Sequence, residues 1–170
     1  MALICETPRL RLRTLTVDHS PFMHRLMNDE AWLRHIGDRN VPTVAATARY
    51  LEASYIASYA QHGFGMWLVE LIKTGEPLGV CGLVQRDYLP EPDLGFGFAP
   101  EARRHGFGFE AAEAVLGWAA ATRPDRQLLA VTSPDNRASI ALLGHLGFVE
   151  RDDLLQLLPE PGRIFSTALG

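Results

Sequence analysis

The stretch from Asp93 to Ala112 limits what this chain can fold into more than any other part of it. It reads DLGFGFAPEARRHGFGFEAA: an apolar run with alternate glycines, a stop at Pro100, a basic loop with glycines, and an alanine-rich helical pattern. The start of a helix leaves backbone N–H groups without partners and carries a partial positive charge, so glycines there let a phosphate approach the main chain. The stretch therefore predicts a strand, a diphosphate-binding turn and a helix.

The loop matches neither of two common phosphate motifs. It lacks the Lys-Ser/Thr pair of a P-loop, and Gly106-x-Gly108 is not followed by the third small residue of a dinucleotide fingerprint. The Arg-Arg-His run at 103–105 supplies donors that suit phosphate oxygens. A tight strand-to-helix connection with solvated arginines is the alternative interpretation.

Composition restricts the class of protein. The 170 residues are 47% hydrophobic and 21% charged, which is typical of one soluble globular domain. The formal charge of −4 disfavours a sequence-independent nucleic-acid binder. No apolar run resembles a signal peptide or a membrane span, so we expect a cytoplasmic protein with no membrane partner. Two distant cysteines and scattered histidines predict neither a disulfide framework nor a metal site.

Hydrophobic periodicity divides the chain into elements. Charged and apolar residues alternate from Arg9 to Leu15, as in a strand with one buried face, and Thr43 is placed to cap a long amphipathic helix. The pattern predicts a single α+β domain over residues 1–170, with a mixed sheet and helices on both faces. The predicted strands are 9–15, 64–72, 77–86, 94–98, 127–132, 148–158 and 164–169; the predicted helices are 16–27, 43–63, 107–122 (ended by 123–125) and 137–146, with a turn at 32–36.

Three motifs, taken in order, resemble the GNAT N-acetyltransferase superfamily and, within it, the RimJ/RimL-like ribosomal-protein N-terminal acetyltransferases. Thr7 to Arg13 resembles the opening strand of that subgroup. The run RRHGFG at 103–108 matches the acyl-CoA signature Arg/Gln-x-x-Gly-x-Gly/Ala, and Asn136 to Ser139 with Leu146 to Phe148 matches the block Asn-x-x-Ser…Leu-Gly-Phe. The resemblance spans nearly the whole chain. It implies a three-layer α+β fold around a mostly antiparallel sheet of about seven strands.

The resemblance also implies how acetyl-CoA binds. In the family, N–H groups of the loop hold the diphosphate, and a bulged strand splays from its neighbour so that the pantetheine arm lies between them. Two alternatives stay open: Gly95 and Gly97 only make room for neighbouring bulk, and Asn136 serves only as a helix N-cap. The residues assigned to the coenzyme are Phe96, Phe98, Ala99, Arg103, Arg104, His105, Gly106, Phe107, Gly108, Phe109, Asn136 and Ser139.

Acetyl transfer to an amine requires removal of the ammonium proton, stabilisation of the thioester oxygen and reprotonation of the thiolate. The resemblance assigns a backbone N–H between Phe96 and Phe98 to the oxygen and the Ser139 hydroxyl to the thiolate. Many relatives carry a tyrosine acid four residues later, where this chain has Leu143. A local helix cap is the alternative role of Ser139.

The general base is assigned to Asp93, at the start of the glycine-rich strand. Some relatives carry a glutamate in the next strand, but Leu128 to Val131 has no ionisable group. Glu91 and Tyr88 are neighbouring substitutes for the base. Simple solvation or ion pairing is the alternative role of Asp93.

The implied function is transfer of an acetyl group from acetyl-CoA to a primary amine by direct attack, without a metal. The acceptor stays open between a protein N-terminal α-amine and a small molecule, and the first two helices and the connection 83–92 are expected to line its side. The missing tyrosine and glutamate favour the alternative of a non-catalytic acyl-CoA-binding protein. A dinucleotide-binding module is disfavoured because the loop lies mid-chain. Homodimers are frequent among relatives.

Overall fold

The computed structural model describes residues 1–124 and 126–170, and one eight-stranded sheet forms its centre. The strand order is β1-β2-β3-β4-β5-β6-β8-β7, and of these neighbours only β5 and β6 run parallel. This architecture confirms the predicted α+β class, and the strand beyond the expected seven is β1. The strands are β1 Leu3–Glu6, β2 Leu10–Thr14, β3 Met66–Leu71, β4 Pro77–Val84, β5 Asp93–Phe98, β6 Gln127–Thr132, β7 Val149–Glu150 and β8 Arg163–Ala168.

Side-chain caps begin three of the helices: Asp29, Thr43 and Asn136 each accept an N–H from the first turn. The predicted helix 43–63 is divided by a π-helical segment, Glu52–Ile56, and stops at Gly63, whose φ is 76°. Asp125, in the segment predicted to end α5, lies outside the described residues. The helices are α1 Ser20–Met27, α2 Glu30–His35, α3 Val44–Leu51, α4 Ala57–His62, α5 Phe107–Thr122 and α6 Arg137–His145, with 3₁₀ turns at Val17–His19, Pro100–Ala102 and Asp152–Leu157.

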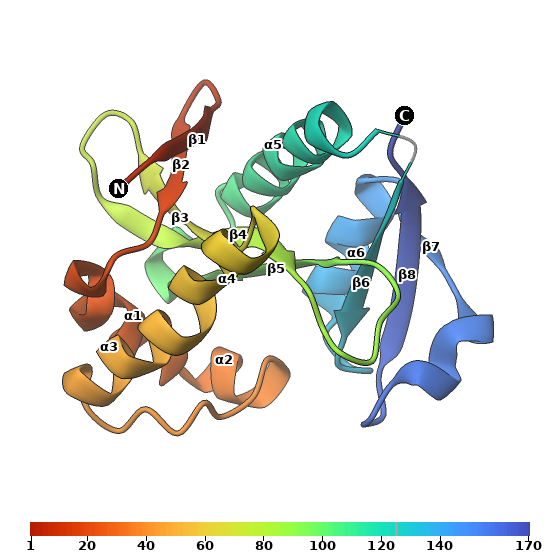
Figure 1. The fold of residues 1–170 in the computed structure, drawn as a ribbon, viewed down its shortest axis with the longest axis horizontal. Helices are drawn as coiled ribbons and strands as arrows, with labels where there is room; N and C mark the ends of the chain where they lie inside the picture. The colour runs from red at the N-terminus through yellow and green to blue at the C-terminus, as the bar shows by residue number, and fades with distance from the viewer. Residues whose placement is uncertain (125) are drawn as a thin grey trace.

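Successive residues of β3 point to opposite faces of the sheet, and each face has its own core. Trp67 belongs to a cluster with Val115 of α5 and Leu143 of α6. Leu68 belongs to a second cluster with side chains of α1, α2 and α3, such as Met27. Helices therefore cover both faces, and Figure 1 shows α1, α2 and α3 grouped together with α5 on the far side of the strands.

The predicted strand 148–158 is wrong over most of its length. Only Val149–Glu150 pair with β8, and 3₁₀ turns follow over Asp152–Leu157. Leu154, Leu157 and Leu158 pack near Leu129 and Ile164, so their spacing of three and four residues belongs to a helical turn. The strand that joins β6 is β8, and β7 lies at the edge.

The sheet is nearly divided between β5 and β6. Asp93 and Leu129 are the one paired position between these strands, next to a hydrogen bond of 3.0 Å from the Leu129 N–H to the Pro92 carbonyl. Beyond that point the strands separate, as the resemblance implied. The bulge that it also implied is absent from the pairing of β5 with β4, which runs without a register shift from Asp93 to Phe98. Figure 1 shows β6 and β8 apart from β1 to β4.

Candidate active site

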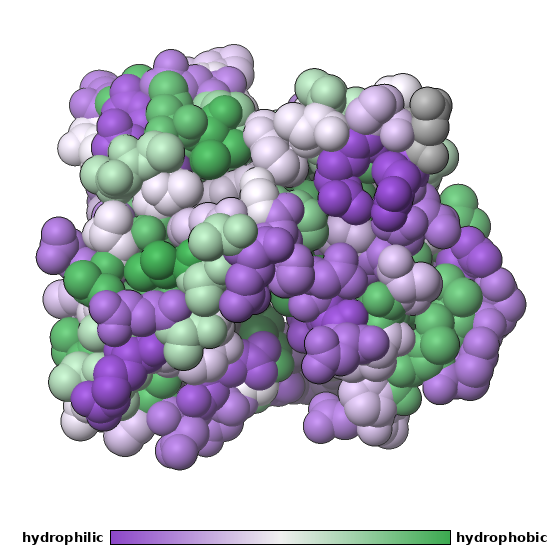
Figure 2. Space-filling view, in the orientation of Figure 1, coloured by the Kyte–Doolittle hydropathy of each residue, from purple (hydrophilic) through white to green (hydrophobic). Residues whose placement is uncertain are grey.

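A cleft of about 1490 Å³ follows the split between β5 and β6. Its lining includes the loop after β5, α2, the π-helical segment and the residues that precede β5. The space-filling view shows a hollow near the middle of this face, bordered by hydrophilic residues (Figure 2). The cleft is lined by every predicted site residue except Ala99 and His105. Of the two helices expected on the acceptor side, the one predicted at 43–63 lines the cleft and the one predicted at 16–27 does not. Residues 83–86 and α2 also line it.

Six consecutive backbone N–H groups, those of Arg104 to Phe109, have no acceptor among the described residues. The flanking N–H groups are occupied, because Arg103 donates to Pro100 and Glu110 donates to Gly106. Gly106 is the N-cap of the sixteen-residue helix α5, so several of the six groups also lie at the positive end of its dipole. The chain therefore presents an anion-binding turn to the cleft.

Two residues of this loop have left-handed backbone conformations. The φ of Arg104 is 65° and that of Gly106 is 78°, values that favour residues without a Cβ. A Cβ at Gly106 would lie 3.3 Å from Nη2 of Arg9. At Gly108 a Cβ would lie 3.2 Å from Cδ1 of Leu142, so this glycine allows α5 to pack closely on α6.

Residues that precede β2 contact the start of α5 and the loop before it from outside the cleft. Glu110 accepts hydrogen bonds from the Thr7 hydroxyl at 2.5 Å, from the Arg9 N–H at 3.1 Å and from Arg9 Nε at 2.7 Å. Arg9 also donates to the His105 carbonyl at 2.9 Å and lies 4.5 Å from the centre of the Phe107 ring. Burial opposes ionisation of Glu110, but these bonds outweigh it and lower the pKa of Glu110. Sequence reasoning did not assign this role to Arg9, although it lies in the first motif.

The two arginines of the loop differ in their partners. Arg103 donates to Asp29 at 2.6 Å and to the Phe98 carbonyl at 3.1 Å, so its side chain is already bonded within the protein. Arg104 is exposed and makes no side-chain bond with the described residues. The expectation that both side chains lie ready for phosphate therefore fits Arg104 better than Arg103.

The peptide groups of Phe96 and Phe98 face the gap beside β6. The Ala99 N–H donates to the Leu78 carbonyl at 2.9 Å, and antiparallel bonding alternates, so Gly97 and Gly95 also bond β4. Phe96 and Phe98 point their peptide groups the other way. Ala99 is 2% exposed and its carbonyl accepts from Ala102, so its main chain is not free for a ligand, contrary to expectation.

The β5 glycines make room for side chains. A Cβ at Gly97 would lie 2.5 Å from Cζ3 of Trp32, and one at Gly95 would lie 3.1 Å from Sδ of Met66. Of the two interpretations left open by the sequence, the structure supports the one in which glycine accommodates neighbouring bulk. Trp32 thereby packs against the strand at the edge of the cleft.

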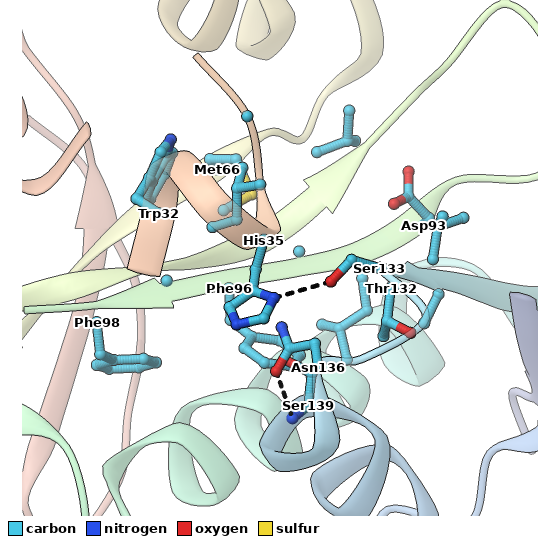
Figure 3. A pocket seen from close by; sticks show the side chains of 18 of the residues that line it. Trp32, His35, Met66, Asp93, Phe96, Phe98, Thr132, Ser133, Asn136 and Ser139 are labelled. Atoms are coloured by element: carbon cyan, nitrogen blue, oxygen red, sulfur yellow. Dashed lines mark hydrogen bonds between the residues drawn. The ribbon is translucent and has the colours of Figure 1, made fainter. Parts of the chain in front are cut away.

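The start of α6 brings Asn136 and Ser139 together. Oδ1 of Asn136 accepts the Ser139 N–H at 3.2 Å, so Asn136 is an N-cap, while its amide nitrogen and the Ser139 hydroxyl make no bond with the described residues. Leu143, at the position where the resemblance implied a tyrosine in many relatives, is fully buried. Figure 3 shows Asn136 and Ser139 on α6 and the carboxylate of Asp93 pointing away from them.

Asp93 is a buried carboxylate, 1% exposed, that also lines the cleft. Burial raises its pKa and the Arg86 guanidinium, with Nε 2.9 Å from Oδ1, counteracts this, which leaves the pKa at about 6. Of the substitutes, Tyr88 lines the cleft, whereas Glu91 is paired with Arg126 and does not. Asp93 is thus ion-paired, yet it titrates in a range suited to accepting a proton.

Sequence reasoning missed three polar groups of the cleft. Nδ1 of His35 lies 2.9 Å from the Ser133 hydroxyl, so α2 closes onto the loop before α6 (Figure 3). Nε1 of Trp32 and Oγ1 of Thr132 are buried without a partner. Unpartnered buried polar atoms on a cleft are places where a ligand can bond. The described residues contain no group of three or more His, Cys, Asp or Glu that could hold a metal ion.

Comparison with known proteins decides the family. The model of the family described as the acetyltransferase (GNAT) domain matches residues 9–149. This chain belongs to the GNAT acetyltransferase family. No helix within the described parts of this GNAT protein has the length and apolarity needed to span a bilayer.

Several relatives of this GNAT protein cover nearly its whole length. The uncharacterized N-acetyltransferase YoaA of Bacillus subtilis is 26% identical over 167 residues, which are 96% of this chain and 93% of YoaA. The acetyltransferase from Agrobacterium tumefaciens has a TM-score of 0.83 at 24% identity, covering 98% of this chain and 94% of its own. RimL, a ribosomal L7/L12 α-N-protein acetyltransferase solved with coenzyme A, has a TM-score of 0.82 at 17% identity, covering 99% and 98%. The two structural likenesses show the fold.

GNAT enzymes use acetyl-CoA, and the groups without partners in this cleft suit that ligand. The free N–H groups at 104–109 suit an anionic diphosphate. The peptide group of Phe96, the N–H of Phe98 and the amide nitrogen of Asn136 suit a polar, extended arm. The Phe98 carbonyl, by contrast, already accepts from Arg103. The site residues are therefore compatible with the coenzyme that the family uses.

Proposed function

We propose that the protein is an acetyl-CoA-dependent N-acetyltransferase of the RimJ/RimL-like subgroup, acting on a primary amine. The observation that carries the proposal is the row of free N–H groups from Arg104 to Phe109, opening onto a cleft that continues through the β5–β6 split. Acetyl-CoA supplies an activated thioester when it is bound. The likeness to RimL, which acts on a protein N-terminus, supports the subgroup.

In this proposal the residues of the chain divide the chemistry between two sides of the cleft. Asp93, with a pKa of about 6, accepts the proton of the acceptor ammonium group directly or through water. A backbone N–H of the Phe96 to Phe98 segment stabilises negative charge on the carbonyl oxygen. The Ser139 hydroxyl hydrogen-bonds the departing sulfur. The side chain of Asp93 points away from Ser139, as expected if the two groups serve different partners (Figure 3).

A thiol-release assay with acetyl-CoA and a panel of amines tests the proposal. We expect release that depends on the amine, with protein N-terminal peptides and small-molecule amines in separate arms. A crystal soaked with coenzyme A tests the site independently. Amides at 104–109 that make no contact with the coenzyme would contradict the assigned binding mode.

A non-catalytic acyl-CoA-binding protein is the second candidate. The observation that favours it is Leu143, a fully buried side chain where many relatives have the acidic tyrosine. Tight binding of acetyl-CoA without turnover across all amines in the same assay would support this alternative.

A further inference from the structure

We propose that Arg39 and Arg86 form a carboxylate-binding subsite at the end of the cleft beside Asp93, so that the acceptor is an amine with a carboxylate close to its amino group. This inference deepens the acetyl transfer proposed above and rests on it. A free α-amino acid and a peptide N-terminus followed by Asp or Glu share this chemistry, and the experiment below distinguishes them.

The lining of the cleft contains more arginines than carboxylates, although the whole chain has a formal charge of −4. Among the described lining residues the carboxylates are only Asp93 and Glu160. Three lining arginines are already paired: Arg34 with Asp135, Arg103 with Asp29, and Arg86 with Asp93. The lining arginines are Arg34, Arg39, Arg86, Arg103 and Arg104.

Arg39 lines the cleft and has no hydrogen-bond or ion-pair partner among the described residues. It follows α2 by way of Gly37, whose φ of 117° is a turn conformation that favours glycine, and its side chain folds back so that Nη1 lies 3.7 Å from the Cβ position of Gly37. Nε of Arg39 is buried without a partner. A guanidinium that is partly desolvated and unpaired favours an anionic ligand.

Arg86 lines the same cleft, and so does Tyr55. Burial raises the pKa of the Tyr55 hydroxyl above its ordinary range, while the positive charges of Arg39 and Arg86 act to lower it. Arg86 bonds Asp93 through Nε, and its terminal amino groups make no bond with the described residues. The tyrosine stays neutral and adds no negative charge that would repel a carboxylate. The π-helical segment, which carries Tyr55, places it in this lining.

The arrangement fits both charges of a zwitterion. Asp93 attracts an ammonium group and accepts its proton, and the planar guanidinium groups beside it suit a carboxylate bound through two oxygens. Asp93 begins β5 and the diphosphate loop follows its end, so this subsite lies about a strand's length from the loop. A polyamine would instead bring a second cation next to the unpaired Arg39.

The test compares amines that differ only in the carboxylate. Values of kcat/KM are measured for L-α-amino acids and their α-carboxamides, for the dipeptides Ser-Asp and Ser-Asn, and for spermidine. In Arg39→Gln we expect the acid substrates to lose about ten- to a hundredfold, as for loss of hydrogen bonds to a charged group, and the amides to change by no more than about twofold. The amino group of an α-carboxamide is less basic than that of the free amino acid, which by itself changes the rate. The decisive quantity is therefore the ratio of kcat/KM for the acid to kcat/KM for the amide, compared between the natural protein and Arg39→Gln.

Arg49→Gln is the matched control, because Arg49 is exposed on α3 and does not line the cleft. Coenzyme A affinity and the unfolding temperature check that Arg39→Gln is folded. Calorimetry of an amino acid titrated into the protein saturated with coenzyme A gives a second readout that does not need turnover. Preference for free amino acids, or for Ser-Asp over Ser-Asn, identifies the source of the carboxylate.

The subsite is overturned if the natural protein prefers spermidine to every carboxylate substrate, or if Arg39→Gln leaves both the acid-to-amide ratio and the calorimetric binding unchanged. Absence of turnover with every amine would contradict the proposed transferase. In that case, calorimetric binding of an amino acid that is lost in Arg39→Gln would still support the carboxylate-binding subsite.

Discussion

Nε of Arg86, a partly exposed side chain, lies 2.9 Å from Oδ1 of the buried Asp93, at the one position where β5 still pairs with β6. Removal of water raises the pKa of Asp93 and the neighbouring positive charge of Arg86 lowers it, with a result of about 6. A single carboxyl group thus changes charge just below neutral pH at the end of the cleft that we assign to the acceptor.

The first prediction concerns the pH dependence of the reaction. Proton acceptance requires the carboxylate, so kcat/KM should rise with pH through the pKa of about 6, reach half of the Asp93-dependent plateau near that value and level off well above it. Asp93→Asn should remove this limb and lower the plateau by about 10²- to 10⁴-fold. Asp87→Asn, a change of an exposed carboxylate nearby, is the control. Persistence of the limb in Asp93→Asn would show that another group accepts the proton.

The second prediction concerns the diphosphate loop. Gly106→Ala adds a Cβ at a φ of 78° and 3.3 Å from Arg9, which costs about 1–2 kcal/mol in the loop geometry that presents the N–H groups. We expect coenzyme A affinity, measured by calorimetry, to fall about tenfold. Gly117→Ala lies in the same helix with no atom within 4 Å of the new Cβ, and its affinity should match that of the natural protein.

The third prediction separates catalysis from binding at Ser139. Ser139→Ala removes the hydroxyl proposed for the sulfur and leaves the backbone N–H that Asn136 accepts. We expect kcat to fall about tenfold or more and coenzyme A affinity to change by no more than about twofold. Ser139→Thr keeps a hydroxyl and should retain most of the activity. An unchanged kcat in Ser139→Ala would leave the serine with its capping role alone.

The fourth prediction concerns the contacts of Glu110. Its pKa is lowered in the folded protein, so its contribution to the free energy of unfolding is present above the ordinary carboxyl pKa and is lost as the pH falls through the folded value. Glu110→Gln should be less stable by about 1 kcal/mol at pH 7, a modest cost because the Arg9 side chain is 46% exposed. Thermal unfolding between pH 3 and pH 7 measures the difference, which should shrink toward low pH. Glu113→Gln, exposed on the same helix, should show none of it.

The features predicted correctly from the sequence are those that depend on residues close together in the chain. Strand alternation, the cap at Thr43 and the glycine loop depend on neighbours in sequence, and the structure has each of them where expected. The contact between His35 and Ser133 joins residues 98 positions apart, and the one between Arg103 and Asp29 spans 74, so no local pattern indicates them. The strand prediction for 148–158 was wrong for a related reason. The leucines of this segment pack on residues of β6 and β8, and this non-local packing favours 3₁₀ turns over an extended strand.

Because Asp93 and Leu129 are the one paired position between β5 and β6, the sheet consists of a five-stranded part and a three-stranded part that are joined at a single point. An extended ligand arm lying between β5 and β6 would provide hydrogen bonds that these strands do not make with each other, and would thereby connect the two parts of the sheet. Amide hydrogens of β6 and β8 should then exchange with solvent more slowly once coenzyme A is added, so a small molecule would complete the architecture as well as supply the chemistry.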